Sequence, residues 1–263
     1  MNVSGRTVLL TGATGGIGHA IARRLHAAGA QLVLTGRRTD VLDPLAAELG
    51  ATSLAVDLSE AAEVERLVGE TLEADIVIAN AAVPASGPLL DFEIEQLDRA
   101  LDVNLRAPMV MARLFGERMV ARGDGHLVFV SSLAGKTATP GSSIYSATKF
   151  GLRGFAQGLR ADLRPTGVGV SVVFPGFIRD AGMFADSGTE LPRFVGTSTP
   201  EEVAEGVLSA IENNRGEVDV APAPVRLGAA LASVAPGLAA GLNHRMGADK
   251  ISEQLSAGQA DKR

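Results

Sequence analysis

The stretch TVLLTGATGGIG at residues 7–18 decides the fold. Its first four residues form a short apolar run, and four glycines follow at Gly12, Gly15, Gly16 and Gly18. A helical pattern comes next, so the stretch indicates a strand, a tight turn and a helix start. Such a turn presents backbone N–H groups and the positive end of a helix dipole to a phosphate, and glycine allows close approach. A merely flexible loop is the alternative, but it needs neither the strand nor the helix.

Strand-like and helix-like stretches alternate along the rest of the chain. We predict strands at residues 7–10, 31–34, 53–56, 75–79, 126–131, 168–174 and 218–220. We predict helices at residues 17–29, 40–49, 59–72, 91–102, 107–122, 145–164 and 199–213. Strands that are apolar on both faces and separated by helices form a parallel sheet with both faces covered. We therefore expect an α/β, Rossmann-like doubly wound parallel sheet with helices on both faces, in a single domain.

Three of these helices have predicted N-terminal caps. Asp40 and Ser59 are residue types that cap helices, and each stands where its helical pattern begins. Thr199 and Glu202 have the spacing of a capping box, and Pro200 suits the first helical position between them.

Composition and charge exclude several classes of function. The chain has 263 residues, a formal net charge of −6 and only 4% aromatic residues, which disfavours binding to nucleic acid. It has no Cys, so disulfides and thiolate metal sites are excluded, and its four His are too scattered to predict a metal site. The apolar run at residues 8–10 is too short for a signal peptide, which favours a cytoplasmic protein.

Arg37 and Arg38 follow the second predicted strand. About 20 residues after a glycine turn, a side chain in this position reads the adenosine ribose of a dinucleotide, and a carboxylate there binds the 2′-hydroxyl of NAD. Two guanidinium groups instead favour the 2′-phosphate of NADP. NAD is the less favoured cofactor, and two ordinary surface arginines are the alternative.

Tyr145 and Lys149 lie four residues apart, on one face of a predicted helix. A nearby ammonium favours the phenolate and lowers the pKa of a tyrosine toward the range useful for proton transfer. Alone, the pair is a weak signal that an ordinary helix surface also produces. Ser132 strengthens it, because this residue ends a buried strand at the edge where doubly wound sheets bind ligands. Asn104 lies between two predicted helices, where its amide can orient a water or a backbone carbonyl.

Together these motifs resemble the short-chain dehydrogenase/reductase family. TGATGGIG is similar to the family's T-G-x-x-x-G-I-G cofactor turn, and Tyr145 with Lys149 matches its Y-x-x-x-K pair. Ser132 stands thirteen residues before Tyr145, which is similar to the family's spacing, and Asn104 has its V-N-L context. The resemblance covers roughly residues 4–220.

The resemblance implies a role for each of these residues. Ser132 would hold the substrate oxygen, and Tyr145 would transfer the proton. Lys149 would bind the nicotinamide ribose and lower the pKa of the tyrosine, and Asn104 would anchor a water in a proton relay. For the cofactor, the resemblance implies that Asp57 contacts the adenine, Asn80 lies near its ribose and Ile178 lies near the carboxamide. The full set of implied cofactor contacts is Gly12, Thr14, Gly16, Ile17, Gly18, Arg37, Arg38, Asp57, Asn80, Tyr145, Lys149, Pro175 and Ile178.

Two positions depart from the family pattern. Residues 79–82 read Ala-Asn-Ala-Ala where the family has N-N-A-G, so Ala82 brings a methyl group toward the cofactor. Asp180 stands four residues after Gly176 where the family often has Thr. A carboxylate there would lie close to an anionic cofactor unless it faces solvent or a basic partner.

Two segments bear on the substrate. Residues 179–198 mix glycines with apolar side chains, so they predict a mobile loop that closes over a bulky or apolar substrate; an ordinary surface excursion is the alternative. A dinucleotide-binding catalytic domain is expected at residues 1–220, followed by a C-terminal apolar extension and polar tail at 221–263. The uncharged run 227–242 is shorter than a membrane span of about 20 residues. Packing against the substrate site or a partner subunit is the favoured interpretation; a membrane-surface helix and a disordered tail are the alternatives.

The leading hypothesis is an oxidoreductase that transfers a hydride between NADP(H) and a small-molecule alcohol or ketone. The resemblance implies a homodimer or homotetramer. A non-catalytic NADP-binding regulator or scaffold is the alternative, but a sensor needs only the glycine turn. A sugar-nucleotide epimerase or dehydratase would need a larger C-terminal substrate domain.

Overall fold

A single sheet of seven parallel strands organises the computed structural model, which describes residues 1–189, 191, 195–235, 237 and 248–259. The strand order is β3-β2-β1-β4-β5-β6-β7, with every neighbouring pair parallel. The strands are β1 (Thr7–Leu10), β2 (Gln31–Gly36), β3 (Thr52–Ala55), β4 (Ile76–Ala79), β5 (Gly125–Val130), β6 (Val168–Pro175) and β7 (Glu217–Val220). This order confirms the expected doubly wound α/β fold, since the chain reverses direction across the sheet after β3.

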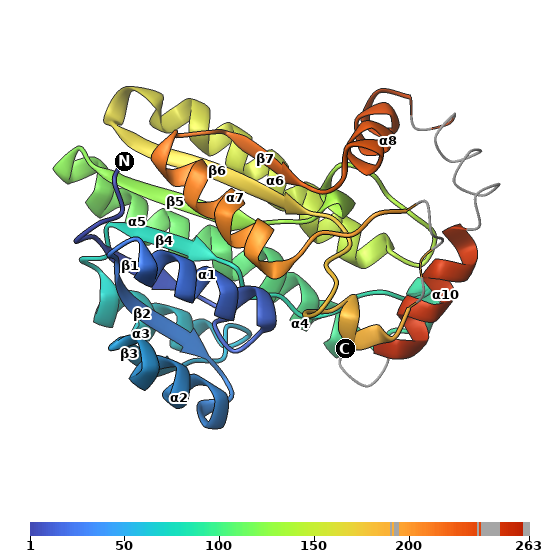
Figure 1. The fold of residues 1–263 in the computed structure, drawn as a ribbon, viewed down its shortest axis with the longest axis horizontal. Coiled ribbons are helices and arrows are strands. Elements are labelled where there is room, and N and C mark those ends of the chain that lie inside the picture. Colours follow the sequence, from blue (N-terminus) through green and yellow to red (C-terminus); the bar gives the residue numbers. More distant parts are fainter. Residues whose placement is uncertain (190, 192–194, 236, 238–247, 260–263) are drawn as a thin grey trace.

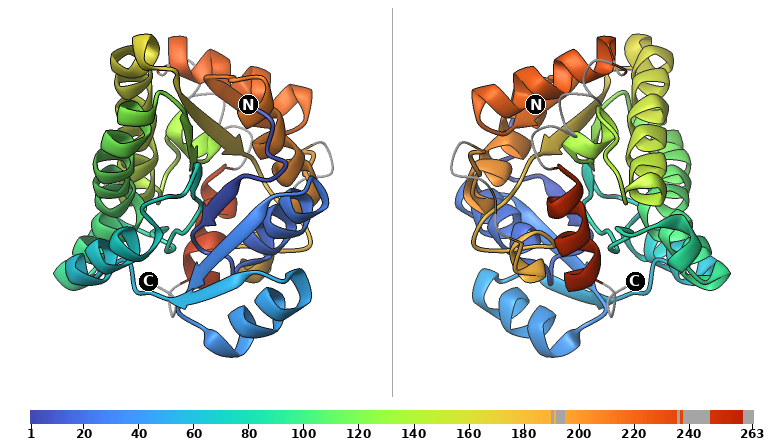
Figure 2. Two further views of the ribbon diagram at one scale, coloured as in Figure 1. Left: turned by 90° about the vertical axis from the view of Figure 1, so that its left-hand side faces the viewer. Right: turned by 90° about the vertical axis from the view of Figure 1, so that its right-hand side faces the viewer.

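Helices cover both faces of the sheet (Figure 1). The helices of the described residues are α1 (Gly16–Ala27), α2 (Thr39–Leu49), α3 (Ala61–Thr71), α4 (Ile94–Leu101), α5 (Ala107–Arg122), α6 (Ser143–Leu163), α7 (Pro200–Glu212), α8 (Ala223–Val234) and α10 (Ala248–Gln259). Of these, α8 and α10 lie beyond the carboxyl ends of the strands rather than on a face of the sheet. The two side views in Figure 2 show α5 and α6 on one side of the sheet and α1 and α7 on the other.

The core divides into two layers because adjacent strand residues point to opposite faces. In β1, Leu9 packs under α3, α5 and α6, whereas Val8 and Leu10 pack under α1, α2 and α7. Every residue of β4, β5 and β6 is buried, which accounts for their nearly continuous apolar sequences.

The three predicted caps have different outcomes. The capping box of α7 is confirmed: Thr199 Oγ1 accepts the N–H of Glu202 at 3.1 Å, and Glu202 Oε2 accepts the N–H of Thr199 at 2.9 Å. The caps at Asp40 and Ser59 are wrong, since Arg38 and Glu60 occupy those positions without side-chain caps. Ser59 instead donates its hydroxyl to the Asp57 carboxylate at 2.7 Å. A local side-chain partner thus competes with the helix end.

The predicted break between the helices at 91–102 and 107–122 is also wrong. α4 continues into a π-helical turn at Asp102–Arg106, which runs directly into α5. Asn104 therefore lies inside a wide helical turn, a feature that often marks functional sites.

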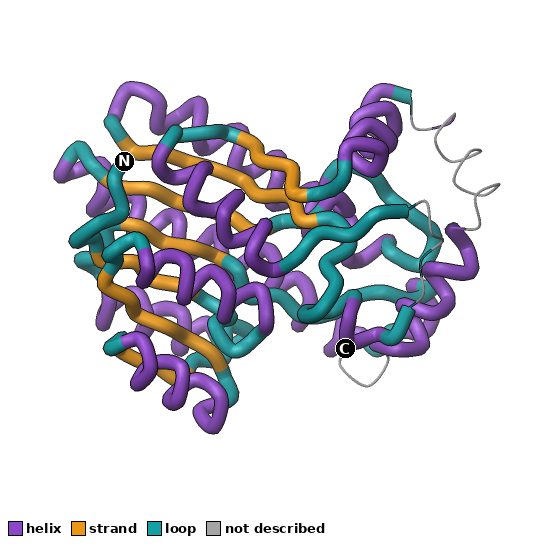
Figure 3. The backbone as a smooth tube through the Cα atoms, viewed as in Figure 1, coloured by secondary structure: helices purple, strands orange, loops and turns teal. Residues whose placement is uncertain are grey.

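The carboxyl ends of the strands point toward α8 and α10, with long loops between them (Figures 1 and 3). Part of the uncharged run 227–242 lies outside the described residues, as does 260–263. Within the part of the chain that the structure describes, no helix is long and apolar enough to cross a bilayer. The same residues contain no group of three or more His, Cys, Asp or Glu that could hold a metal ion.

Candidate active site

The glycine turn between β1 and α1 is too tight to accept side chains. Gly12 has a φ of +67°, and a Cβ there would lie 2.7 Å from the Cα of Ala81. A Cβ on Gly18 would lie 2.2 Å from the carbonyl oxygen of Gly12. Because α1 begins at Gly16, the N–H groups of its first turn have no carbonyl one turn earlier to bind. The turn is thus a backbone-lined cradle that suits the pyrophosphate of a dinucleotide.

Thr11, which the sequence analysis did not single out, joins this turn to β4. Its hydroxyl oxygen accepts the N–H groups of Asn80 and Ala81, both at 3.1 Å. The Asn80 amide donates to the carbonyls of Thr11 and Gly12 at 3.0 and 3.1 Å. The threonine that opens the TGATGGIG motif was the available signal. Asn80 therefore shapes the glycine turn and, by its position, also lines the cavity described below.

The end of β2 lies directly beside this turn. Arg38 Nη2 donates to the carbonyl of Thr14 at 2.6 Å, and a Cβ on Gly36 would lie 2.6 Å from Thr14 Cγ2. Arg37 Nη1 lies 3.7 Å from Asp57 Oδ2, and both side chains are substantially exposed. The structure thus gathers Thr14, Arg37, Arg38 and Asp57 beside the glycine turn, and none of the four lines the cavity described below.

Ser132, Tyr145 and Lys149 come together at the carboxyl end of β5. Ser132 caps the short 3₁₀ turn Leu133–Gly135, and its hydroxyl lies close enough to Tyr145 to influence the pKa of the phenol. Tyr145 and Lys149 lie one turn apart on α6, with the ammonium 5.6 Å from the centre of the tyrosine ring. Lys149 is 2% exposed and donates from Nζ to the Val130 carbonyl at 3.2 Å. All three predicted side chains line one cavity.

Burial controls the acidity of this pair. It raises the pKa of Tyr145 to about 12, and the neighbouring Ser132 side chain opposes that rise. Burial also lowers the pKa of Lys149 to about 8. The depression of the tyrosine pKa expected from Lys149 does not emerge in this geometry, where burial has the largest effect on the pKa of the phenol.

Asn104 does not line the cavity that these three residues share. It is 1% exposed, its Oδ1 accepts the N–H of Val83 at 2.8 Å, and its Nδ2 donates to the Val83 carbonyl at 3.0 Å. Both ends of the amide thus bind one backbone residue in the loop after β4. This geometry matches the expectation that it orients a backbone carbonyl.

The loop after β6 packs against the glycine turn, since a Cβ on Gly16 would lie 2.2 Å from the Cβ of Ala181. Pro175 ends β6, Ile178 pairs with Ser198, and both Pro175 and Ile178 line the cavity. Asp180 has a φ of 70°, and its side chain is 68% exposed with Arg179 Nε 3.4 Å from its carboxylate. The carboxylate therefore faces solvent and a basic partner, which removes the conflict that the sequence raised.

A cavity of about 440 Å³ opens beside Tyr145. Its wall beyond Ser132, Tyr145 and Lys149 is mostly apolar. The loop after β6 contributes Met183 and Phe184, whose ring lies 5.1 Å from that of Phe177. The part of the predicted mobile loop at 190 and 192–194 lies outside the described residues.

Helices α8 and α10 complete this cavity, and the sequence did not identify which of their residues do so. α8 contributes Val225 and Ala229, and α10 contributes Ile251 and Leu255. The i, i+4 spacing of each pair is the only local signal that could have indicated a shared face. Ser252 Oγ donates to the Pro140 carbonyl, which ties α10 to the loop before Tyr145.

Comparison with known proteins supports one family. The model for short chain dehydrogenases matches residues 6–191. The ketoacyl reductase HetN of Nostoc sp. is 34% identical over 232 residues, which cover 85% of this chain and 81% of that protein.

Solved structures are similar over most of their length. A short-chain dehydrogenase from Sphingobium yanoikuyae in complex with NADPH has a TM-score of 0.77 at 30% identity, covering 89% of this chain and 94% of that one. The bulky-bulky ketone specific alcohol dehydrogenase from Comamonas testosteroni has a TM-score of 0.76 at 26% identity, covering 90% and 94%. With its glycine cradle and its fold, this chain belongs to the short-chain dehydrogenase/reductase family and is an NAD(P)-dependent oxidoreductase that acts on CH–OH groups.

Proposed function

We propose that this enzyme uses NADP(H) to interconvert a bulky, apolar ketone and its secondary alcohol. The observation that carries the proposal is the apolar cavity of about 440 Å³ with Ser132, Tyr145 and Lys149 in its wall. A cavity of this size suits a small organic molecule that is mostly buried when bound.

The proton chemistry follows from the three side chains. In ketone reduction, Ser132 and Tyr145 donate hydrogen bonds to the carbonyl oxygen, and Tyr145 passes its proton to that oxygen as the C–O bond becomes single. The ammonium of Lys149 stabilises the phenolate that remains. When bound, the nicotinamide dinucleotide supplies or accepts the hydride. Burial raises the pKa of Tyr145 to about 12, so the phenol is protonated at neutral pH and ready to act as the acid.

Arg37 and Arg38 support NADP as the preferred form of the cofactor. Both residues follow β2, with the Arg38 guanidinium beside Thr14 and the Arg37 guanidinium beside Asp57. A 2′-phosphate bound there would gain charge-assisted hydrogen bonds. The similar structure from Sphingobium yanoikuyae holds NADPH, and a similar serine dehydrogenase was solved with NADP+. Asp57 would contact the adenine, and Asn80, Pro175 and Ile178 would line the rest of the dinucleotide site.

The C-terminal extension supports a bulky substrate. Within the described residues after β7, α8 and α10 place Val225, Ala229, Ile251 and Leu255 in the cavity wall. We assign 1–220 to dinucleotide binding and catalysis, and α8 and α10 to one side of the substrate wall. The likeness to an alcohol dehydrogenase specific for bulky-bulky ketones points the same way.

Exposed apolar side chains support assembly into a homodimer or homotetramer. Met109 and Val120 on α5 are 38% and 39% exposed, and Phe150 on α6 is 41% exposed. Burying them against a second copy would remove apolar area from water.

The test is a ketone panel graded by size, from acetone to benzophenone, with NADPH consumption followed by absorbance. We expect kcat/KM to rise with the apolar bulk on both sides of the carbonyl. Tyr145→Phe should lower kcat by about 10²–10⁴-fold and leave the Kd for NADPH unchanged. A Tyr145→Phe enzyme as active as the wild type would contradict the mechanism, and a preference for acetone would contradict the substrate class.

A further inference from the structure

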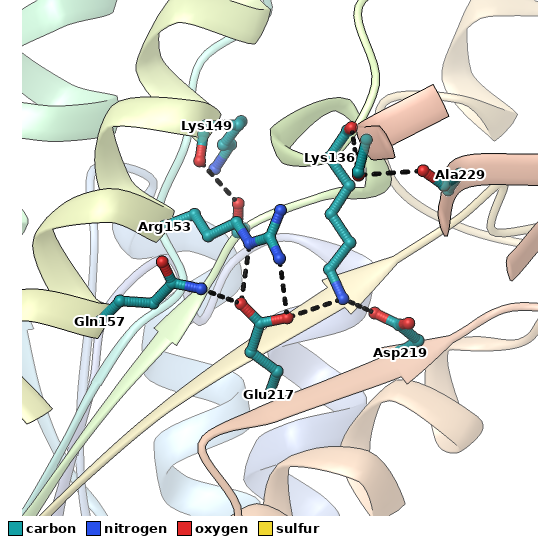
Figure 4. A network of polar contacts seen from close by, with 9 residues as sticks. Lys136, Lys149, Arg153, Gln157, Glu217, Asp219 and Ala229 are labelled. Atoms are coloured by element: carbon teal, nitrogen blue, oxygen red, sulfur yellow. Dashed lines mark hydrogen bonds and ion pairs between the residues drawn. The ribbon is translucent and has the colours of Figure 1, made fainter. Parts of the chain in front are cut away.

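A partly buried carboxylate at the start of β7, that of Glu217, binds side chains from two different elements (Figure 4). Glu217 Oε1 accepts Arg153 Nε at 2.7 Å and Gln157 Nε2 at 2.8 Å. Glu217 Oε2 accepts Arg153 Nη2 at 3.2 Å and lies 2.9 Å from Lys136 Nζ. Glu217 therefore connects α6 to the loop after β5.

Lys136 has a second carboxylate partner. Its Nζ donates to Asp219 Oδ1 at 2.5 Å and lies 4.1 Å above the centre of the Phe174 ring, while the residue is only 9% exposed. Glu217 and Asp219 are two apart in β7, so they project from the same face of the sheet. Two cations, Lys136 and Arg153, balance two carboxylates, and the cluster carries no net charge.

Glu217 is anionic in this environment. Burial raises the pKa of its carboxyl group, but the hydrogen bonds from Arg153 and Lys136 outweigh burial and hold the pKa below its usual range. The Glu217 carboxylate thus stays ionised near neutral pH and keeps its ion pairs with Lys136 and Arg153.

Each cation belongs to an element that carries a catalytic side chain. Lys136 closes the turn that Ser132 opens: its N–H donates to the Leu133 carbonyl at 2.8 Å, and Ser132 Oγ accepts the N–H of Ala134 at 3.2 Å. Arg153 lies one helical turn after Lys149 on α6. Glu217 therefore joins the Ser132 turn to the helix that carries the tyrosine.

We propose that Lys136 and Glu217 are positioning residues that hold the Ser132 hydroxyl against that of Tyr145. Neither residue lines the described cavity, so each acts through Ser132 and α6 rather than on the substrate. The inference rests on the proposed proton-transfer function. Ser233 Oγ of α8 also donates to the Lys136 carbonyl at 2.9 Å, so the same residue anchors one wall of the substrate cavity.

The test needs variants that keep the cluster neutral, because a single buried charge left unpaired would unfold the chain. Lys136→Met with Asp219→Asn removes one cation and one carboxylate together, and leaves Glu217 paired with Arg153. Arg113→Gln with Glu117→Gln is the matched control, since this pair is exposed on α5 at 2.6 Å.

In the full chain, we expect the Lys136→Met, Asp219→Asn variant to lower kcat for ketone reduction about tenfold. The Kd for NADPH should stay within about twofold of the wild type, and the control pair should behave as the wild type. Lys136→Arg should recover most of the lost kcat because it keeps the cation. Ser132 lowers the pKa of Tyr145, so a displaced Ser132 should leave that pKa higher. The pH at which the rate of alcohol oxidation rises should therefore be higher in the Lys136→Met, Asp219→Asn variant than in the wild type. The groups that face this phenol are Ser132 from the turn after β5 and Lys149 from α6.

A Ser132→Ala background separates positioning from general stability. If Lys136 acts through Ser132, the double substitution costs less than about twofold in kcat there. An unchanged tenfold loss in that background, or a loss confined to the Kd for NADPH, would overturn the proposal. Wild-type activity in Ser132→Ala alone would instead contradict the proposed catalytic function. If the wild type reduces ketones and the Lys136→Met, Asp219→Asn variant has the same kcat, only the positioning role is contradicted.

Discussion

Asn104 and Val83 exchange two hydrogen bonds, with the Asn104 amide accepting at 2.8 Å and donating at 3.0 Å. The pair joins the π-helical turn before α5 to the loop after β4. That loop begins with Asn80 and Ala82, which line the cavity. Asn104 therefore sets the position of a cavity wall from outside the cavity.

Asn104→Ala should destabilise the fold and reduce activity together. The substitution leaves the buried N–H and carbonyl of Val83 without partners, which costs about 2–4 kcal/mol of unfolding free energy. Urea denaturation measures the loss. Asn213→Ala is the control, because its amide bonds lie at the exposed end of α7, and it should change stability by less than about 1 kcal/mol. If Asn104→Ala is as stable as Asn213→Ala, the two hydrogen bonds between Asn104 and Val83 do not stabilise the fold.

Gly18→Ala and Gly69→Ala should have opposite effects, although both glycines lie in helices. A Cβ on Gly18 would lie 2.2 Å from the Gly12 carbonyl oxygen, whereas a Cβ on Gly69 would meet nothing within 4 Å. Gly69→Ala should therefore raise the unfolding free energy by about 0.5–1 kcal/mol through helix propensity. Gly18→Ala should lower it and weaken NADPH binding, as measured by thermal unfolding and cofactor titration. Normal NADPH affinity in Gly18→Ala would contradict the role assigned to the glycine cradle.

Arg37→Ala should reduce affinity for NADP more than affinity for NAD. Loss of one charge-assisted hydrogen bond to a 2′-phosphate costs about 1.5–3 kcal/mol, or roughly 10–100-fold in kcat/KM for NADP. The ratio of kcat/KM for the two cofactors is the measurement. Arg23→Ala is the control, because Arg23 pairs with Glu48 on the surface at 2.6 Å and should leave the ratio unchanged. A constant ratio in Arg37→Ala would remove this residue from the phosphate site.

His126 should make the fold sensitive to acid. Burial, with smaller effects of the N-terminal ammonium and Arg160, lowers its pKa from 6.5 to about 3, and its Nε2 lies 2.8 Å from Ser171 Oγ. Between these two values the unfolded chain binds a proton that the folded chain does not. The unfolding free energy should therefore fall as the pH drops from 6.5 toward 3, by up to about 1.4 kcal/mol per unit from this group.

His126→Gln should flatten this dependence in denaturation series run across that range. His26→Gln, at an exposed position, is the matched control and should keep the wild-type slope. Equal slopes in the wild type and His126→Gln would assign the acid sensitivity to other groups.

The regular elements were predictable because the signals for them are local. The apolar strands, the glycine turn and the α7 capping box depend on residues within a few positions of one another. Asp40 and Ser59 were misjudged as caps because the sequence does not show which partner a side chain will choose. Ser59 binds Asp57, which satisfies the hydroxyl outside the helix.

The direction of Asp180 could not be read from the chain either. Its positive φ and its proximity to Arg179 turn the carboxylate toward solvent, and both depend on how the loop after β6 crosses the glycine turn. The sequence also could not predict that Ile251 and Leu255 line the cavity, because their helix lies more than a hundred positions after Tyr145.

The sequence by itself determined the doubly wound fold and the glycine turn, and it singled out Ser132, Tyr145 and Lys149 as candidate catalytic residues, because spacing along a strand, turn or helix indicates them. Only the tertiary structure decided how these groups are held. The Glu217 cluster joins residues 136, 153 and 219, which are distant in sequence and adjacent only when β7 pairs with β6. Burial, which raises the pKa of Tyr145 and lowers that of Lys149, is likewise a property of the packed molecule, because desolvation requires neighbours from several elements at once.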